Sequence, residues 1–166
     1  MKKLVIRLVL IAPLALGICV TSCKKDDDSS DSDDTQTPST TLDPCNGDDG
    51  FCMTYGGTEK SGPASLIILN SNKVRVFWEN GTGNDFEQVE LDVYSVAPGT
   101  FDVNNNGLAN SAFVQYYSAT SGTNNAAYGT VTVTALDTAG AVTGTFKVTM
   151  NDSTKITNGK FTNIMQ

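Results

Sequence analysis

The sequence Val142-Thr-Gly-Thr-Phe-Lys-Val-Thr-Met150 decides the fold of this chain, because two kinds of residue alternate through all nine positions. The even-numbered residues are apolar or glycine, and the odd-numbered residues are threonine or lysine, so the two kinds point to opposite faces of an extended strand. One apolar face opposite one polar face is typical of an antiparallel sheet with one side in water.

A last strand is predicted at 154–164, and it contains a change of phase. Ile156 and Phe161 are an odd number of positions apart, so a regular strand would point them to opposite faces. The pair Asn158-Gly159 between them indicates either a hairpin turn or a β-bulge in one long strand. A neighbouring strand as long as 141–150 needs a matching partner, which favours the bulge.

Six other strands are predicted by runs of apolar or alternating residues at 65–69, 73–79, 86–96, 101–103, 112–119 and 129–135. No segment has an apolar period near 3.6 residues, so we expect little or no helix. Strands that follow one another with short turns predict an all-β fold of about seven to nine strands, an antiparallel sandwich or a flattened barrel.

The first 22 residues have the three parts of a secretory signal peptide. Basic residues precede an apolar stretch at 8–20, which is shorter than the about 20 apolar residues of a transmembrane helix. The run Val20-Thr-Ser-Cys23 then resembles the bacterial lipobox, in which the cysteine is diacylated and becomes the new N-terminus. We therefore expect residues 1–22 to be cleaved and Cys23 to attach the protein to a membrane through lipid.

The residues after Cys23 refine this location. Lys24-Lys-Asp-Asp-Asp28 resembles the lysine-then-acidic signal of surface-exposed lipoproteins of the Bacteroidota, which implies the outer membrane and the cell exterior. The alternative is a solvated linker on a protein that faces the periplasm. Residues 24–44 contain seven Asp and almost no large apolar side chain, so 23–44 is predicted to be a disordered acidic tether. Residues 45–166 remain for a single β domain.

Cys45 and Cys52 close a short loop that contains Asn-Gly and Asp-Asp-Gly turns. In an exported chain such a pair is typical of a disulfide. Two thiols alone make a poor zinc site in a chain without histidine, and their spacing is not that of a redox-active Cys-x-x-Cys pair. We expect a structural disulfide that fixes the start of the domain.

Four segments of the chain share a glycine-led β pattern: Pro-Gly-Thr-Phe (98–101), Gly-Thr-Val-Thr-Val (129–133), Gly-Thr-Phe (144–146) and Ile-Thr-Asn-Gly-Lys-Phe-Thr-Asn (156–163). Together they resemble a Bacteroidota lipoprotein domain family of unknown function, over residues 60–166. The resemblance implies the same compartment and a β fold, and it implies no activity or binding site.

The composition narrows the possible chemistry. The absence of histidine excludes Ser–His and Cys–His catalysis, and a net charge of −7 argues against nucleic-acid binding.

One segment matches the start of a calcium loop, namely Asp102-Val-Asn-Asn-Asn-Gly107, but Phe113 stands where a glutamate ligand is required. We therefore expect no catalytic residue, no metal, no cofactor and no enzyme activity. The alternative is a glycosidase-like pair of acids, with the candidates Glu79, Asp85, Glu87, Glu90 and Asp92.

Aromatic side chains are the remaining candidates for contact with a ligand. Tyr116 and Tyr117 are adjacent on a predicted strand, so they point to opposite faces and one of them can be exposed. Trp78 is either a core residue or an exposed ring. An exposed tyrosine or tryptophan at these positions would stack on a sugar or anchor a protein contact.

These observations favour a non-enzymatic binding or adhesion module that is anchored by lipid at the cell surface, with a glycan or a protein as its ligand. The alternative is a structural or accessory subunit of an outer-membrane complex. Co-purification with a membrane partner would distinguish the second role from the first.

Overall fold

A computed structural model of the chain describes residues 43–69, 72–137 and 140–166, which belong to one compact unit. The predicted signal peptide, the lipid on Cys23 and most of the acidic tether fall in residues 1–42 and lie outside the described ranges. None of the helices within these ranges has the length and apolar character to cross a membrane.

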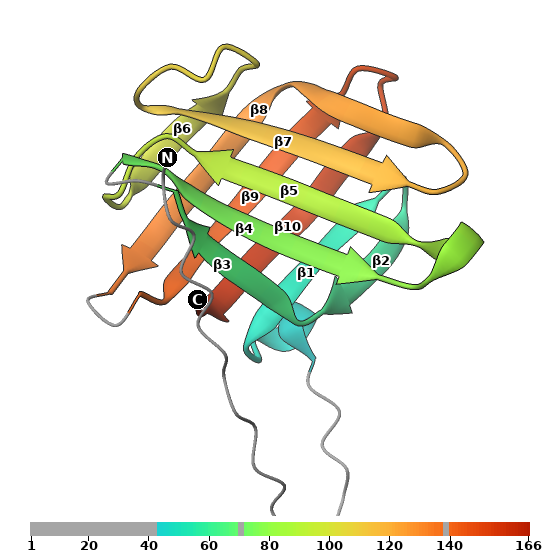
Figure 1. The fold of residues 1–166 in the computed structure, drawn as a ribbon, viewed down its shortest axis with the longest axis horizontal. Coiled ribbons are helices and arrows are strands. Elements are labelled where there is room, and N and C mark those ends of the chain that lie inside the picture. The colour runs from blue at the N-terminus through green and yellow to red at the C-terminus, as the bar shows by residue number, and fades with distance from the viewer. Residues whose placement is uncertain (1–42, 70–71, 138–139) are drawn as a thin grey trace, which may run out of the picture. The chain divides into compact units, whose positions relative to one another are not determined.

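The described residues are organised mainly as β-strands, which confirms the predicted all-β class (Figure 1). The ten strands are β1 (Gly50–Tyr55), β2 (Thr58–Gly62), β3 (Ala64–Ile68), β4 (Val74–Asn80), β5 (Glu87–Val93), β6 (Gly99–Val103), β7 (Ser111–Ser118), β8 (Gly122–Leu136), β9 (Val142–Met150) and β10 (Lys155–Ile164). Two short 3-10 turns, η1 (Pro44–Asn46) and η3 (Gly83–Asp85), accompany them.

The sheet has ten strands, more than the seven to nine expected. The two additional strands, β1 and β2, form a hairpin that precedes the first strand predicted from the sequence. The sequence of β2 is Thr-Glu-Lys-Ser-Gly, which has no apolar alternation. Backbone pairing with β1, rather than a side-chain pattern, makes this segment a strand.

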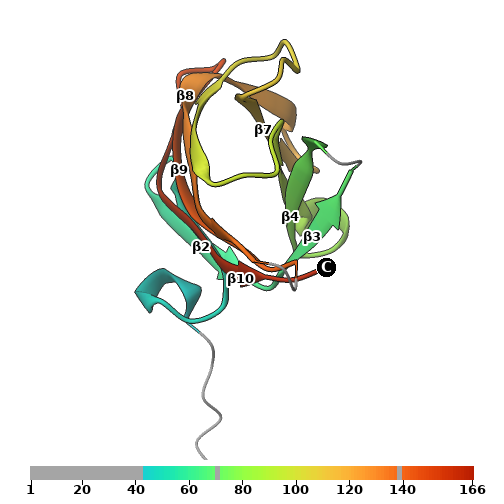
Figure 2. The same cartoon turned by 90° about the vertical axis from the view of Figure 1, so that its left-hand side faces the viewer.

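All ten strands belong to one sheet, in the order β2-β1-β10-β9-β8-β6-β7-β5-β4-β3. Most pairings are antiparallel, whereas β6 and β7 pair in parallel over a short distance. The sheet curls so that β7, β5, β4 and β3 lie across from β8, β9, β10 and β1 (Figures 1 and 2). The result is a nearly closed, barrel-like sheet, the flattened-barrel form of the predicted fold.

A single bent segment brings the two edges of the sheet together. The edge strands β2 and β3 are separated in the chain by Pro63 alone, so the chain passes from one edge to the other at this corner. The Leu66 N–H of β3 also donates to the Met165 carbonyl, just beyond β10, at 3.0 Å. Glycine suits position 62 at this corner because a Cβ there would crowd the Trp78 indole nitrogen, at a distance of 3.3 Å. These contacts cover edges that an open sheet would expose.

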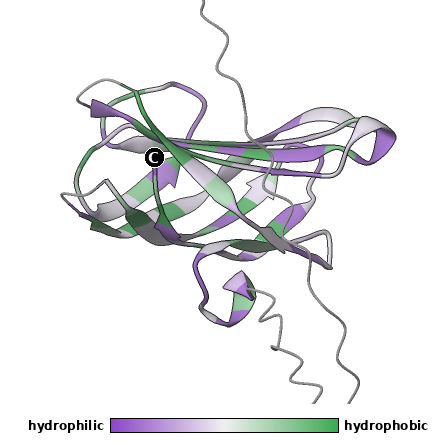
Figure 3. Ribbon diagram, turned by 60° about the horizontal axis from the view of Figure 1, so that its bottom comes forward, coloured by the Kyte–Doolittle hydropathy of each residue, from purple (hydrophilic) through white to green (hydrophobic). Residues whose placement is uncertain are grey.

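The apolar faces of the strands line the interior of the barrel. Figure 3 shows hydrophobic and hydrophilic residues alternating along the strands. The Phe51 ring of β1 connects the two halves of the core, because it lies 5.6 Å from the Trp78 ring on β4 and 5.5 Å from the Phe146 ring on β9. Phe51 and Trp78 have no exposed surface, so these rings fill the centre of the barrel.

Two glycines make room for large rings between β9 and β10. Gly144 pairs with Phe161, and Gly159 pairs with Phe146, so each phenylalanine ring lies against a glycine of the neighbouring strand. A Cβ at either glycine would overlap the facing ring. The sequence Gly-x-Phe occurs in both strands. In each strand the glycine therefore receives the phenylalanine ring of the other strand.

The β-bulge predicted in the last strand is confirmed. β10 is one continuous strand, and its register with β9 shifts between Ile156 and Gly159. Asn158 takes the left-handed backbone conformation, with a φ of 53°, at this bulge. Ile156 and Phe161 consequently both point into the core, where each is fully buried.

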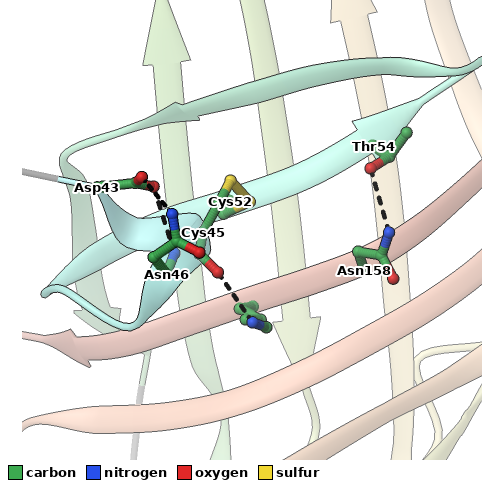
Figure 4. The surroundings of a disulfide bond; sticks show 7 residues. Asp43, Cys45, Asn46, Cys52, Thr54 and Asn158 are labelled. Carbon is green, nitrogen blue, oxygen red and sulfur yellow. Dashed lines mark hydrogen bonds between the residues drawn. A yellow bond between two sulfur atoms is a disulfide. The ribbon is translucent and has the colours of Figure 1, made fainter.

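The predicted disulfide between Cys45 and Cys52 is present, with 5.1 Å between the two Cα atoms (Figure 4). It joins η1 to β1. The Asp43 carboxylate accepts hydrogen bonds from the backbone and side-chain N–H groups of Asn46 at 3.2 and 2.6 Å. Lys160 Nζ on β10 donates to the Cys45 carbonyl at 2.9 Å. The disulfide therefore fastens η1 to the sheet at the start of the described domain.

Gly144→Ala is expected to destabilise the fold. A methyl group at this position overlaps the Phe161 ring and the Thr132 carbonyl, so overpacking should lower the free energy of unfolding by about 1–3 kcal/mol. Denaturation by urea, followed through the fluorescence of buried Trp78, measures the change. Thr145→Ala, at the adjacent exposed position, is the control and should change stability by less than about 0.5 kcal/mol. Equal stability of the two variants would contradict the packing described here.

Candidate functional site

The structure buries two of the three aromatic residues that the sequence suggested as ligand contacts. Trp78 is 0% exposed and Tyr116 is 3% exposed, because both point into the barrel. Neither can present a ring face to a ligand on the outside of the sheet, so an exposed platform at these positions is ruled out. Tyr117 is half-buried, with its ring 6.0 Å from that of Phe86.

Tyr116 belongs instead to a polar cluster that joins distant strands. Its hydroxyl donates to Glu87 Oε1 at 2.7 Å, and Lys60 Nζ donates to both carboxylate oxygens of Glu87 at 2.6 Å. The Tyr116 ring stacks on that of Tyr55, with centroids 3.9 Å apart. Lys60 comes from β2 and Glu87 from β5, which are far apart in the order of the sheet, so the cluster ties the two halves of the barrel together.

The ionisation of this cluster suits a structural role. Burial raises the pKa of the Glu87 carboxyl, but hydrogen bonds from Lys60 and Tyr116 outweigh it, and the net pKa lies below its usual value. Burial and the hydrogen bond to Glu87 raise the pKa of the Tyr116 hydroxyl above its usual value. Glu87 therefore stays charged and Tyr116 stays protonated near neutral pH, whereas a proton-transferring pair needs pKa values near the working pH.

Two more of the acids considered as a catalytic pair are held in ion pairs on neighbouring strands. Arg75 on β4 contacts Glu90 through Nη2 and Asp92 through Nε, both at 2.6 Å. Lys73 Nζ contacts Asp92 at 2.5 Å. These carboxylates are therefore neutralised by adjacent cations. The remaining two candidates, which are exposed, are Glu79 and Asp85.

The calcium-like segment at 102–107 begins at the end of β6 and forms a turn that leads to β7. The Asn104 side-chain oxygen accepts a hydrogen bond from the Asn106 backbone N–H at 3.1 Å, and Gly107 has a φ of 62°. In the part of the chain that the structure describes, no three cysteine or acidic side chains gather in a way that could hold a metal ion.

Tyr128 is an exposed aromatic residue that the sequence analysis did not single out, and its side chain is 64% exposed. It follows a β-bulge in β8, where Ala126 pairs with Met150 and Tyr128 pairs with Thr149, which leaves Ala127 as an extra residue. The bulge reverses the alternation, so Ala126 is buried and Tyr128, two positions later, faces solvent. The sequence does contain a signal for this exposure. In 129–135 the odd-numbered residues are predicted to face the core, and the same alternation continued back to position 128 would point Tyr128 outward.

Tyr128 lines a groove of about 690 Å³ on the outer face of β8, β9 and β10. The polar side chains of the groove form two rows across these strands. The first row is Tyr128, Thr149 and Lys155, which are paired in register, and the second row is the pair Thr130 and Lys147 with Thr157 beside it at the bulge of β10. Gly129 allows β8 and β9 to pack closely beside Tyr128, because a Cβ there would overlap the Lys147 carbonyl.

A second hollow, of about 320 Å³, continues the groove, since Thr130 and Lys147 line both. It adds a third row, in which Thr132, Thr145 and Lys160 are paired in register. The Thr132 hydroxyl is hydrogen-bonded to that of Thr100 on β6 at 3.0 Å. We call the nine residues of these three rows the threonine–lysine face.

The threonine–lysine face is positively charged in an acidic protein. No Asp or Glu lines either hollow. Residues 43–166 contain six Lys and Arg, of which three form the ion pairs described above. The other three, Lys147, Lys155 and Lys160, all lie on this face and form no ion pair with the acids of the described ranges. The face can therefore hold a polar ligand with negative charge.

A family model described as Domain of unknown function (DUF6252) matches residues 71–165. The match extends to the end of β10 and contains the whole threonine–lysine face, whereas the Cys45–Cys52 disulfide lies outside it. It confirms the expectation of a domain family of unknown function. Neither the curated proteins nor the solved structures include a match to the chain.

Glu87→Gln is expected to lower the stability of the fold and to weaken its dependence on pH. The pKa of Glu87 is lower in the folded state than in the unfolded chain, so its stabilising contribution is present at neutral pH and is lost as the pH falls through the folded pKa. At pH 7 the substitution should lower the free energy of unfolding by about 1–3 kcal/mol, because Lys60 loses a charged partner.

Urea denaturation at about pH 7 and about pH 3, on either side of the usual glutamate pKa, measures this effect. The difference between wild type and Glu87→Gln should shrink at the lower pH. Glu59→Gln, at an exposed position on β2, is the matched control. A difference that stays the same at both pH values would show that charge on Glu87 is not what stabilises the cluster.

Proposed function

The chain belongs to the family described as Domain of unknown function (DUF6252), and we propose that it is a non-enzymatic binding module with a glycan as its ligand. The ligand lies on the threonine–lysine face. Cys23 carries lipid and anchors the module in the outer membrane, with the domain facing the cell exterior.

The exposed ring of Tyr128 is the main support for this proposal. A tyrosine that is 64% exposed beside a groove leaves an apolar surface in water, and a sugar ring can cover it by stacking. Threonine hydroxyls line the groove beside it and are able both to donate and to accept hydrogen bonds, as sugar hydroxyls require. A few polar groups around one aromatic surface are typical of a small-molecule or sugar site.

The paired state of the acids favours binding over catalysis. Glu87, Glu90 and Asp92 each contact a cation, and none of them lines the groove beside Tyr128. The face offers hydroxyl and ammonium groups, which suit recognition, and lacks the acid pair that glycoside hydrolysis requires.

The lipid anchor and the acidic tether support a display role. Two acyl chains on Cys23 give a durable attachment to a membrane. Residues 24–44, most of which lie outside the described ranges, carry seven Asp against two Lys, a composition that suits a solvated spacer between anchor and domain.

Tyr128→Ala is expected to weaken glycan binding while leaving the fold intact. Binding of the full chain, purified in detergent, to a panel of glycans should fall by about tenfold, which corresponds to about 1.4 kcal/mol. The melting temperature without ligand should not change measurably, because the side chain is exposed. Tyr117→Ala, which removes a half-buried tyrosine outside the groove, is the control and should bind as the wild type does.

Unchanged binding in Tyr128→Ala would place the site elsewhere. No binding of the wild type to any glycan would count against a glycan-binding module. Retention of a membrane partner in mild detergent would then favour the accessory-subunit role.

Cys23→Ser is expected to abolish the attachment of lipid to the protein. Without a thiol at this position no acyl chain can be attached, so cells supplied with a radiolabelled fatty acid should leave this variant unlabelled. Cys19→Ser, which alters a cysteine within the predicted signal peptide, is the matched control and should be labelled as the wild type is. Equal labelling of Cys23→Ser and the wild type would contradict lipidation at Cys23.

A further inference from the structure

The three lysines of the threonine–lysine face are spaced regularly by the register of the sheet. Lys155 lies opposite Thr149, and Lys160 lies opposite Thr145, so Lys147 on β9 is diagonal to both. Diagonal neighbours in an antiparallel pair are about 7–8 Å apart. Each of the three rows therefore contains one lysine, and the three ammonium groups follow one another along the groove.

The surroundings of these lysines make their charge available. Lys147 and Lys155 are exposed, and acids line neither hollow of the groove. Lys160 is also exposed, but its Nζ donates to the Cys45 carbonyl and its side chain shares a further hollow, beside the disulfide, with Glu59. Elsewhere in residues 43–166 the acids are in excess, with twelve Asp and Glu against three Lys and Arg. The three cations of the described ranges that form no ion pair therefore all lie on one face of the sheet.

We propose that the ligand of this face is an anionic polysaccharide, a sugar chain with a carboxylate or sulfate on successive units. This inference rests on the proposed function and adds the charge of the ligand to it. The Tyr128 ring stacks on one sugar unit, and the lysines of successive rows pair with the negative groups of the following units.

An extended chain fits this face better than a single small anion does. A small anion is held by donors that converge in one pocket, whereas these lysines stand in separate rows along an open groove. A chain that repeats its charge can contact each row in turn, so several weak contacts add to one useful affinity.

Two other polyanions fit the face less well. Nucleic acid carries about one charge per 1.7 Å of duplex and needs many cations, more than the three lysines of this face supply. An acidic peptide would need apolar anchor pockets for its binding energy, but the solvent-facing side chains here are mainly threonine and lysine. Sugar hydroxyls match the threonines that alternate with the lysines.

The test measures binding of the full chain in detergent to two matched pairs of polymers. One pair is polygalacturonate and its methyl ester, which differ in the carboxylate, and the other is dextran sulfate and dextran, which differ in the sulfate. At least one charged polymer should bind about tenfold more tightly than its neutral counterpart at 0.01 M salt, where the Debye length is about 30 Å, and this preference should vanish at 1 M salt, where it is about 3 Å. The pair that shows the preference identifies the anionic group.

The double variant Lys147→Gln with Lys155→Gln tests the face itself and should lose about tenfold in affinity for the charged polymer. The double variant Asn84→Asp with Asn105→Asp lowers the net charge by the same amount, through exposed residues that do not line the groove, and should bind as the wild type does. Equal losses in the two double variants would overturn the inference, because net charge rather than this face would govern binding.

Two further results would overturn the inference in different ways. Equal binding of charged and neutral polymers, lost in Tyr128→Ala but kept in the lysine variant, would remove the requirement for charge and leave the glycan-binding function standing. Tighter binding of a single-stranded DNA oligonucleotide than of either charged polymer would replace the polysaccharide with nucleic acid. No binding of any of these polymers would count against both the inference and the proposed function.

Discussion

Two phenylalanine rings, each packed on a glycine of the neighbouring strand, hold the hairpin on which the rest of the structure depends. Phe161 lies against Gly144, and Phe146 lies against Gly159. Phe146 also contacts Phe51, which stacks on the tryptophan of β4 across the barrel. A side chain at either glycine would displace the facing ring and disturb this series of contacts, because protein interiors have little spare volume. The packing of the two halves of the sheet therefore depends on where glycine stands in β9 and β10.

Two of the three strands that form the face of the proposed site, β8 and β10, contain β-bulges that set which side chains point outward. In β8 the extra residue Ala127 moves Tyr128 to the solvent side. In β10 the bulge at Asn158 returns Phe161 to the core and leaves Lys160 on the outer face. Since a shift of one residue reverses the face of every following side chain, these bulges produce the core and the groove together.

The distribution of charge divides the molecule into two parts with different properties. The cations of β2 and β4 form ion pairs with carboxylates, and the bond between Lys60 and Glu87 links strands from opposite halves of the sheet order. Lys147 of β9 and Lys155 of β10 lie among threonines, without an acid in the hollows that they line, whereas Lys160 of β10 also lies beside Glu59 in a hollow near the disulfide. Removing one partner of a buried ion pair leaves a charge without compensation, so these pairs tolerate substitution poorly, whereas unpaired charges on an open surface are available to a ligand.

Local patterns in the sequence are enough to predict the all-β class, the disulfide and the bulge in the last strand. Each of these follows from neighbouring residues: the alternation of 142–150, the close spacing of Cys45 and Cys52, and the change of phase around Asn158. Tertiary contacts were needed to turn Tyr116 inward, to make β2 a strand, and to set which lysines form ion pairs with acids. Those features depend on the register between strands and on contacts across the barrel, which join residues far apart in the chain and which no local pattern records.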